Sequence, residues 1–92
     1  MIRSFKCDKT EALFEGKAVA RFANFRKVAE RKLQMLHRSK QIEDLRIPPG
    51  NRLEALSGDR RGQSSIRIND QWRLCFVWVA GDATEVEIVD YH

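Results

Sequence analysis

The first half of the chain spaces its apolar residues at the period of a helix. Steps of three and four residues separate Phe22, Phe25, Ala29, Leu33 and Leu36, so these side chains share one face. The opposite face is polar and carries Asn24, Lys27, Arg31, Gln34 and Arg38. The pattern predicts an amphipathic helix whose polar face is solvated.

The segment before this helix predicts two short elements. Residues 2–6 alternate well enough for a short strand. Asp8 is then placed as a helix N-cap, with Glu11 three residues later completing a capping box. Gly16 is expected to end this short helix, because glycine readily adopts the left-handed conformation found after helix ends.

The period changes from helical to alternating after the turn expected at Pro48-Pro49-Gly50. Residues 53–56 predict a short strand and residues 57–62 a loop. Three further strands are expected at 66–68, 72–79 and 85–89. The fold class is therefore α+β, with N-terminal helices packed on one face of a small antiparallel β-sheet. A length of 92 residues predicts a single domain, residues 1–92.

Hairpin register follows from matching apolar residues with apolar residues across strands. A three-residue turn at 69–71 sets Ile66 opposite Leu74, and it also sets Arg67 opposite Arg73. A two-residue turn gives a worse match on the core side.

A turn at 81–83 sets the register of the next hairpin, with Trp78 opposite Val86 and Phe76 opposite Ile88. Continuing that pairing brings Arg73 opposite Tyr91. The prediction is a row across the open face of the sheet formed by Arg67, Arg73 and Tyr91.

Two arginines directly opposite each other repel, so an anion is expected beside them. Glu87 lies on the same predicted face and is one candidate. A bound phosphate is the other, because guanidinium groups bind phosphate oxygens in a fork geometry. The spacing alone leaves both interpretations open.

Charge along the chain is uneven. The chain has 17 Lys and Arg against 13 Asp and Glu, a net charge of +4, which suggests a polyanionic partner. Most of the basic residues precede Arg73. The segment after Arg73 has no Lys or Arg, and its acidic residues are Asp82, Glu85, Glu87 and Asp90. One positive face beside an acidic strand is the functional interpretation, and an ordinary solvated surface is the alternative.

The remaining polar residues near the predicted row suit cleavage of RNA without a metal. Tyr91 and His92 follow the well-patterned strand predicted at 85–89. Glu54 stands in the short strand predicted at 53–56. Attack by a 2′-hydroxyl on its own phosphodiester needs a proton acceptor, a proton donor and cations for the developing charge. No phosphate-binding glycine loop, nucleophile pair or metal-ligand spacing is present, so we expect no metal and no cofactor.

The two cysteines and the hydropathy limit the cellular setting. Cys7 and Cys75 lack metal-ligand spacing, and Cys75 lies in an apolar run typical of a buried free thiol. We expect His37, at the end of the long helix, to be a surface residue. With no apolar stretch suited to a signal peptide or a membrane span, we expect a cytoplasmic protein that does not contact the membrane.

Two segments resemble the HigB-like toxins of the RelE superfamily: NRLEALSGDR continued by QSSIRINDQWR at 51–73, and VEIVDYH at 86–92. The opening MIRSF and the helix segment AERKL at 29–33 fit as well. The resemblance covers nearly the whole chain. It implies a RelE-like fold and ribosome-dependent endonuclease activity on mRNA in the decoding site. It also implies neutralisation by a helix-turn-helix, HigA-like antitoxin that binds operator DNA, so the toxin would reach DNA only through that antitoxin.

The resemblance also implies roles for individual residues. Arg73 would stabilise the scissile phosphate, with Arg67 close by. Tyr91 and His92 would handle protons or orient the nucleophile, and Asp90 would support them. Glu54 falls where relatives carry a histidine or a glutamate. Contacts to the RNA backbone would come from Arg60 and Arg61.

Two positions depart from the family pattern. Ser57 stands where many relatives have a lysine, so one phosphate-binding cation is missing. Ser64 stands where an aromatic residue or a histidine is common, so a stacking or proton-handling group is missing. If these positions contact RNA, the hypothesis is a mild toxin or one with altered codon preference.

Three alternatives to this enzyme remain open at this point. The fold would act as an antitoxin partner with weak or lost catalysis, or it would bind ribosomal RNA or an assembly factor without cleavage. A basic domain with an unrelated role is the third. The polar face of the long helix would also contribute to RNA binding if it forms a lid over the site.

Overall fold

The long amphipathic segment forms two successive helices in the computed structural model, which describes residues 1–91. A 3₁₀ helix spans Ala20–Phe25, and helix α2 spans Arg26–Arg38. The apolar positions predicted for one face are all buried, and the polar positions of the other face are exposed. No helix among the described residues is long and apolar enough to cross a membrane.

Helix α1 spans Asp8–Phe14, so the short helix was predicted correctly but its cap was not. Cys7 is the N-cap, its side chain makes no capping hydrogen bond, and Asp8 is the first helical residue. Asp8 and Glu11 still lie in the first turn, where their negative charges interact favourably with the helix dipole. The capping-box prediction is therefore wrong, although the start of the helix was misplaced by only one residue.

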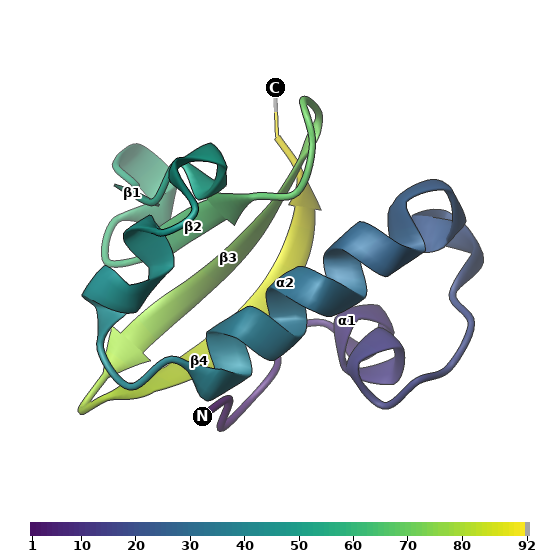
Figure 1. The fold of residues 1–92 in the computed structure, drawn as a ribbon, viewed down its shortest axis with the longest axis horizontal. Helices are drawn as coiled ribbons and strands as arrows, with labels where there is room; N and C mark the ends of the chain where they lie inside the picture. The colour runs from purple at the N-terminus through teal and green to yellow at the C-terminus, as the bar shows by residue number, and fades with distance from the viewer. Residues whose placement is uncertain (92) are drawn as a thin grey trace.

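Four strands form one antiparallel sheet in the order β1-β2-β3-β4. Their bounds are Glu54–Ala55 for β1, Ser64–Arg67 for β2, Trp72–Val79 for β3 and Asp82–Asp90 for β4. Helix α2 lies across one face of this sheet and α1 lies beside it (Figure 1). The predicted α+β class is confirmed.

The core lies between α2 and the sheet. Ile66, Leu74 and Phe76 from the sheet are fully buried together with Leu33 and Leu36 from α2. Because side chains alternate along a strand, burial of these residues commits their neighbours to the other face. The core therefore decides which residues lie on the face that α2 leaves uncovered.

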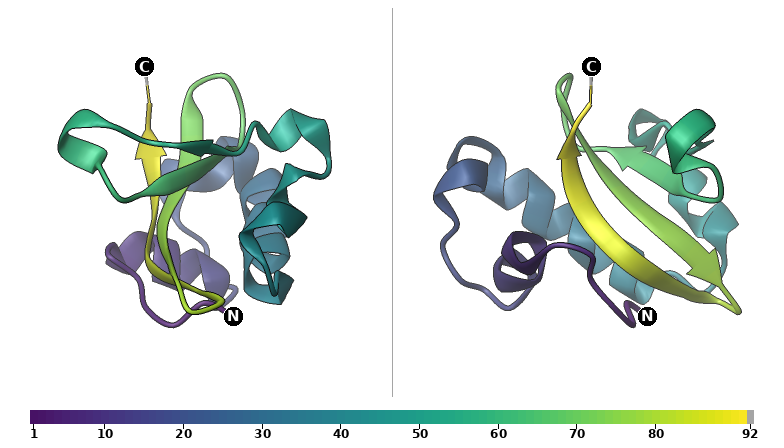
Figure 2. Two further views of the ribbon diagram at one scale, coloured as in Figure 1. Left: turned by 90° about the vertical axis from the view of Figure 1, so that its left-hand side faces the viewer. Right: turned by 180° about the vertical axis from the view of Figure 1, so that it is seen from behind.

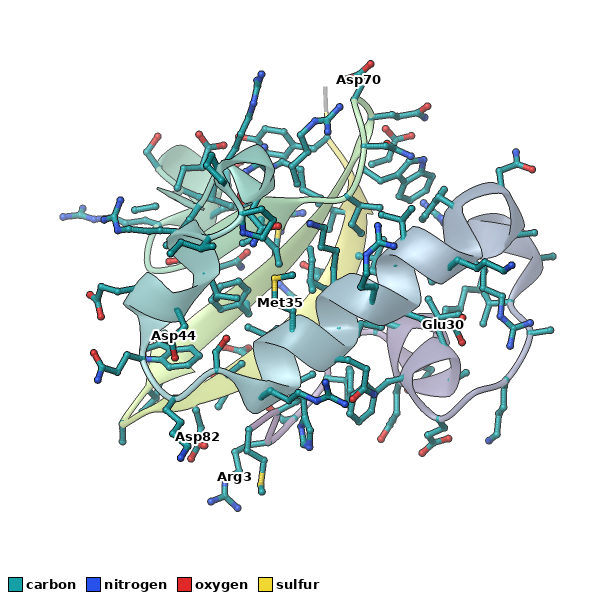
Figure 3. The ribbon with its side chains drawn as sticks, in the orientation of Figure 1. Arg3, Glu30, Met35, Asp44, Asp70 and Asp82 are labelled. Carbon is teal, nitrogen blue, oxygen red and sulfur yellow. The ribbon has the colours of Figure 1, made fainter. Side chains whose placement is uncertain are left out.

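The N-terminal segment does not form the predicted strand. It makes two isolated parallel bridges to β4, Ile2 with Ala83 and Phe5 with Val86. The Arg3 side chain and the N-terminal amine both reach Asp82, and Figure 3 shows Arg3 and Asp82 close together at one end of the molecule. His37 is half-buried rather than a surface residue, because its Nδ1 accepts the Ile2 N–H at 3.1 Å.

The first hairpin has the predicted register, with Ile66 opposite Leu74 and Arg67 opposite Arg73. The turn at 69–71 is held by the Asn69 side chain, whose oxygen accepts the N–H groups of Gln71 and Trp72 at 2.9 and 2.8 Å. Side-chain acceptors of this kind are common in tight turns.

The register predicted for the second hairpin is wrong. Ala80 and Gly81 form the turn, both with positive φ, which is typical of a two-residue hairpin turn. Trp78 consequently lies opposite Ala83, and a bulge between Cys75 and Val77 shifts the pairing once more. Beyond the bulge Leu74 faces Ile88 and Arg73 faces Val89.

The net error beyond the bulge is two residues, because Arg73 faces Val89 instead of Tyr91. A shift of two residues preserves the face on which a side chain lies. Tyr91, two residues after Val89, therefore remains on the same face as Arg73. The predicted row survives as a diagonal arrangement rather than as direct cross-strand pairs.

Candidate active site

The face of the sheet that α2 does not cover gathers polar side chains from four segments. The pairs Glu54–Ser65, Arg67–Arg73 and Arg73–Val89 place these residues on one side, and Tyr91 follows Val89 by two residues. Figure 2 (left) shows α2 on one side of the sheet and the 3₁₀ turn Gly58–Arg60 on the other. Backbone pairing thus brings together residues that are far apart in the chain.

Arg73 is the centre of this cluster and only 11% of its side chain is exposed. Its Nε donates to the Ser65 hydroxyl at 2.8 Å, and its Nη2 donates to the backbone oxygen of Arg52 at 2.7 Å. Glu54 Oε1 lies 3.5 Å from the same nitrogen. The guanidinium also lies over the Tyr91 ring, with Cζ 5.8 Å from the ring centre. Arg73 is therefore held in one orientation.

Each of the two paired arginines has its own carboxylate, and neither uses Glu87. Arg67 pairs with Asp70 in the β2–β3 turn, at the tip labelled in Figure 3, and Arg73 pairs with Glu54. Glu87 instead binds Arg60 at 2.9 Å. Of the two anions left open for the arginine pair, Glu87 is therefore not the one that offsets their repulsion.

The Arg60–Glu87 pair ties the 58–60 turn to β4. Arg60 Nη1 donates to Glu87 and also to the Gln63 side chain at 3.1 Å. The hydrogen bond to Glu87 is the main cause that raises the pKa of Arg60. Lys6 reaches the same Glu87 oxygen at 3.9 Å. Arg60 is thus a fixed cation beside the Arg73 cluster.

A small apolar cluster lies on the same face of the sheet as the polar residues. Leu56, Cys75 and Val89 are buried together, separate from the main core. Cys75 is a free thiol, as predicted, and burial raises its pKa to about 11. The thiol is therefore neutral at physiological pH and packs as a small apolar group on the face that carries Arg73.

The carbonyl that orients Arg73 belongs to a turn fixed from the α2 side. Arg52 has a left-handed backbone with φ of 47°, and the preceding Asn51 is completely buried. The Asn51 side chain accepts a hydrogen bond from Lys32 of α2 and donates to the Leu45 carbonyl at 3.1 Å. The Asn51 side-chain amide also donates a hydrogen bond, at 3.1 Å, to the sulfur of Met35, which lies on α2 and is labelled in Figure 3.

Lys32 is itself unusual, since it is 9% exposed and forms no ion pair within residues 1–91. Burial lowers the pKa of its ammonium, and the nearby cations Arg31 and Arg67 lower it further. Sequence reasoning missed Lys32, Asn51 and the Arg52 carbonyl. Each lies at a position whose burial or backbone geometry appears only in the folded chain.

The other predicted site residues do not all join this cluster. Asp90 faces Trp72 and accepts the Gln71 side-chain amide at 3.0 Å. Ser57 and Arg61 are exposed on the loop that carries Arg60. Ser64 pairs with Phe76, which places it on the α2 side, whereas its neighbour Ser65 contacts Arg73. His92, predicted to be part of the site, lies outside the described residues.

The arrangement is suited to binding a phosphodiester. Arg73 Nη1 makes no hydrogen bond within residues 1–91, so it remains available to a ligand. The same guanidinium lies over the phenol ring of Tyr91. Tyr91 is 39% exposed, so a ligand can reach it. Fixed cations of this kind stabilise the charge that develops on a phosphate in its transition state.

Comparison with known proteins assigns the chain to a family. Residues 3–92 match the model of the HigB-like toxins, described as RelE-like toxins of type II toxin–antitoxin systems. A relative from Proteus vulgaris, named Endoribonuclease HigB, is 34% identical over 94 residues that cover all of both chains. The chain belongs to the HigB-like toxin family, as the resemblance predicted.

A second relative is more similar over a shorter stretch. Toxin HigB-1 from Vibrio cholerae is 55% identical over 53 residues, which cover 58% of this chain and 56% of that protein. An uncharacterized protein from Haemophilus influenzae matches over 54% of its length at 46% identity. The chain thus matches about half the length of these two relatives.

Solved structures confirm the fold. A crystal structure of a YafQ mutant from E. coli superimposes with a TM-score of 0.61 and covers 98% of this chain and 93% of that one. YafQ from E. coli strain BL21(DE3) superimposes with a TM-score of 0.58. Sequence identities of 13% and 14% mean that these likenesses concern the fold alone.

Proposed function

We propose that this chain is an endoribonuclease, the toxin of a type II toxin–antitoxin system, and that it cleaves RNA without a metal. The observation that supports this most strongly is Arg73, a nearly buried guanidinium held by Ser65 and the Arg52 carbonyl with Nη1 turned to no described acceptor. A cation already fixed in place needs no reorganisation when charge develops on the phosphate.

In the proposed reaction the 2′-oxygen forms a bond to phosphorus while the bond from phosphorus to the 5′-oxygen breaks. One proton leaves the 2′-hydroxyl and one proton is taken up by the departing 5′-oxygen. Tyr91 and His92 handle these protons, and Asp90 supports them. Arg73 and Arg67 neutralise the phosphorane oxygens. The need for a 2′-hydroxyl selects RNA over DNA.

The substrate is mRNA in the ribosomal decoding site, and the protein acts in the cytoplasm. A helix-turn-helix, HigA-like antitoxin neutralises it and carries it to operator DNA. This part of the proposal follows the family to which residues 3–92 belong. Glu54, Arg60 and Arg61 belong to the RNA-facing surface in this scheme, with Ser57 on the same loop and Ser64 as the least well placed.

Mapping transcript ends after induction tests the proposal. The wild-type chain should produce new internal 5′ ends within translated regions and arrest growth. Arg73→Ala and truncation of His92 should abolish both effects. Arg46→Ala is the matched control, because Arg46 is an exposed arginine whose side chain forms no hydrogen bond or ion pair within residues 1–91.

Three other results would overturn all or part of the proposal. Growth arrest with intact transcripts would indicate binding to ribosomal RNA or to an assembly factor without cleavage. Cleavage that survives both Arg73→Ala and loss of His92 would show that the reaction occurs elsewhere on the molecule. If induction caused no growth arrest and no cleavage, the chain would be a toxin fold that acts only as a partner of its antitoxin.

A further inference from the structure

A hollow of about 340 Å³ wraps around the edge of β4 beside the Arg73 cluster. Its walls come from the start of α1, the 3₁₀ helix Ala20–Phe25, the 58–60 turn and the last residues of β4. Figure 2 (right) shows α1 beside β4, which forms this edge of the sheet. We refer to this hollow, lined among others by Lys9, Arg21, Arg60 and Val89, as the edge pocket.

Two cations of the edge pocket have no carboxylate partner. Lys9 and Arg21 form no ion pair within residues 1–91, and both are exposed. The Arg21 guanidinium lies over the Trp72 ring, with Cζ 5.3 Å from the ring centre. Stacking on an aromatic ring orients a guanidinium while its N–H groups remain free to bind an anion in their own plane.

The acids at the edge pocket are already engaged. Glu87 is bound by Arg60 at 2.9 Å and lies 3.9 Å from Lys6, and only 16% of its side chain is exposed. Asp90 accepts the Gln71 amide at 3.0 Å. Among the lining residues, the three cations Lys9, Arg21 and Arg60 outnumber the two carboxylates by one, so the edge pocket attracts an anion.

The edge pocket continues directly from the face that carries Arg73. Val89 lies in its wall and faces Arg73 across the β3–β4 ladder. Arg60 borders both regions, since it lines the pocket and its charge also acts on Cys75 and Tyr91. A chain of phosphates held at Arg73 would therefore meet the edge pocket as it crosses β4.

We propose that the edge pocket binds a backbone phosphate of RNA adjacent to the scissile one, with Lys9 and Arg21 as the contacting cations. The identity of the ligand as RNA rests on the proposed function. A phosphodiester carries a single negative charge and suits two unpaired cations. The pocket thereby sets the direction in which the RNA leaves the cleavage site.

A non-cleavable RNA tests this inference. A hexanucleotide with every 2′-oxygen methylated keeps its phosphates but cannot attack them. Titration of the full chain, labelled with ¹⁵N and followed by NMR, should shift the Arg21 side-chain signal. Lys9→Gln and Arg21→Gln should each weaken binding several-fold. Each should also lower the slope of log affinity against log salt by about 0.7, the value expected for one phosphate contact on a single strand.

Lys27→Gln is the matched control, because Lys27 is an exposed lysine of α2, which covers the opposite side of the sheet and forms no lid over the Arg73 cluster, and its loss changes the net charge equally. Lys9 is exposed in the first turn of α1, so Lys9→Gln keeps the test sound even if Arg21→Gln disturbs folding through Trp72. Equal affinities and salt slopes for Lys9→Gln and Lys27→Gln would overturn the inference. So would tighter binding of an acidic hexapeptide than of the RNA, which would assign the pocket to a protein partner.

The outcome is separable from that of the proposed function. Lys9-dependent RNA binding by a chain that never cleaves would retain the edge pocket and reject the nuclease. Normal cleavage with RNA binding that does not depend on Lys9 or Arg21 would retain the nuclease and reject the edge pocket as an RNA-binding site.

Discussion

The role proposed for Arg73 rests on the groups that surround it rather than on its charge alone. Its Nε and Nη2 are occupied by Ser65 and by the Arg52 carbonyl, and the Tyr91 ring packs against it. A lysine has one compact ammonium and cannot satisfy these acceptors and bind a phosphate at the same time.

Arg73→Lys is therefore expected to lower the cleavage rate about a hundredfold or more, as the loss of one fixed donor does at other catalytic anion sites. Single-turnover cleavage of translated mRNA measures the effect. Arg46→Lys, the same change at an exposed arginine, should leave the rate unchanged. Equal rates for the two variants would remove Arg73 from the proposed mechanism.

Ser57 is a position where the resemblance to the family implies a missing lysine, with a clear consequence for charge. It is exposed on the loop next to Arg60, so a lysine there has room to reach a phosphate. Ser57→Lys is expected to increase cleavage of translated mRNA and to sharpen its salt dependence. Glu43→Gln adds the same net charge at an exposed site and serves as the control. An unchanged rate would refute the hypothesis of a weak toxin.

At the scale of elements, α2 both covers the core and fixes the turn that positions Arg73. Lys32 reaches from α2 to Asn51, and the next residue supplies the carbonyl that binds Arg73. A buried ammonium is stable only while it keeps its acceptor.

Asn51→Ala should lower the free energy of unfolding by about 3 kcal/mol, because Lys32 is left buried without its acceptor. Adding Lys32→Met should recover part of that loss, since no buried charge remains. Urea unfolding at neutral pH measures both variants. Asn24→Ala, on the exposed face of the 3₁₀ helix, should be neutral. Additive losses in the double variant would contradict the coupling.

At the scale of the whole molecule, Asp82 ties the N-terminal segment to β4. It lies 3.3 Å from the N-terminal amine and 3.0 Å from Arg3 Nε. The hydrogen bond from Arg3 is the main cause that lowers the pKa of Asp82 below its usual value. A carboxyl whose pKa is lowered by folding contributes stability above its unfolded pKa, and this stability is lost as the pH falls through the folded value.

Asp82→Asn is accordingly expected to lower the urea midpoint at pH 6, whereas wild type and variant should converge below the folded pKa of Asp82. Unfolding curves between pH 2 and pH 6 measure this difference. A gap that stays constant over the whole range would show that Asp82 acts by packing rather than by charge. Asp59→Asn, at an exposed acid without an ion pair within residues 1–91, is the control.

Periodicity along the chain determined the α+β class, the burial of the apolar face of α2 and the first hairpin register. These features follow from local spacing and from matching apolar residues across a short turn. The same reasoning placed Arg67 and Arg73 side by side and kept Tyr91 on their face. Family membership followed from the segments 51–73 and 86–92 and was confirmed over residues 3–92.

Only the tertiary structure decided which groups Arg73 contacts. The two-residue turn at Ala80 and Gly81 and the bulge after Cys75 moved β4, so Val89 rather than Tyr91 faces Arg73. Ser65, the Arg52 carbonyl and the Lys32–Asn51 support come from segments whose proximity no local pattern encodes. Local spacing specifies which face a side chain takes, whereas the distances between segments depend on packing of the whole chain.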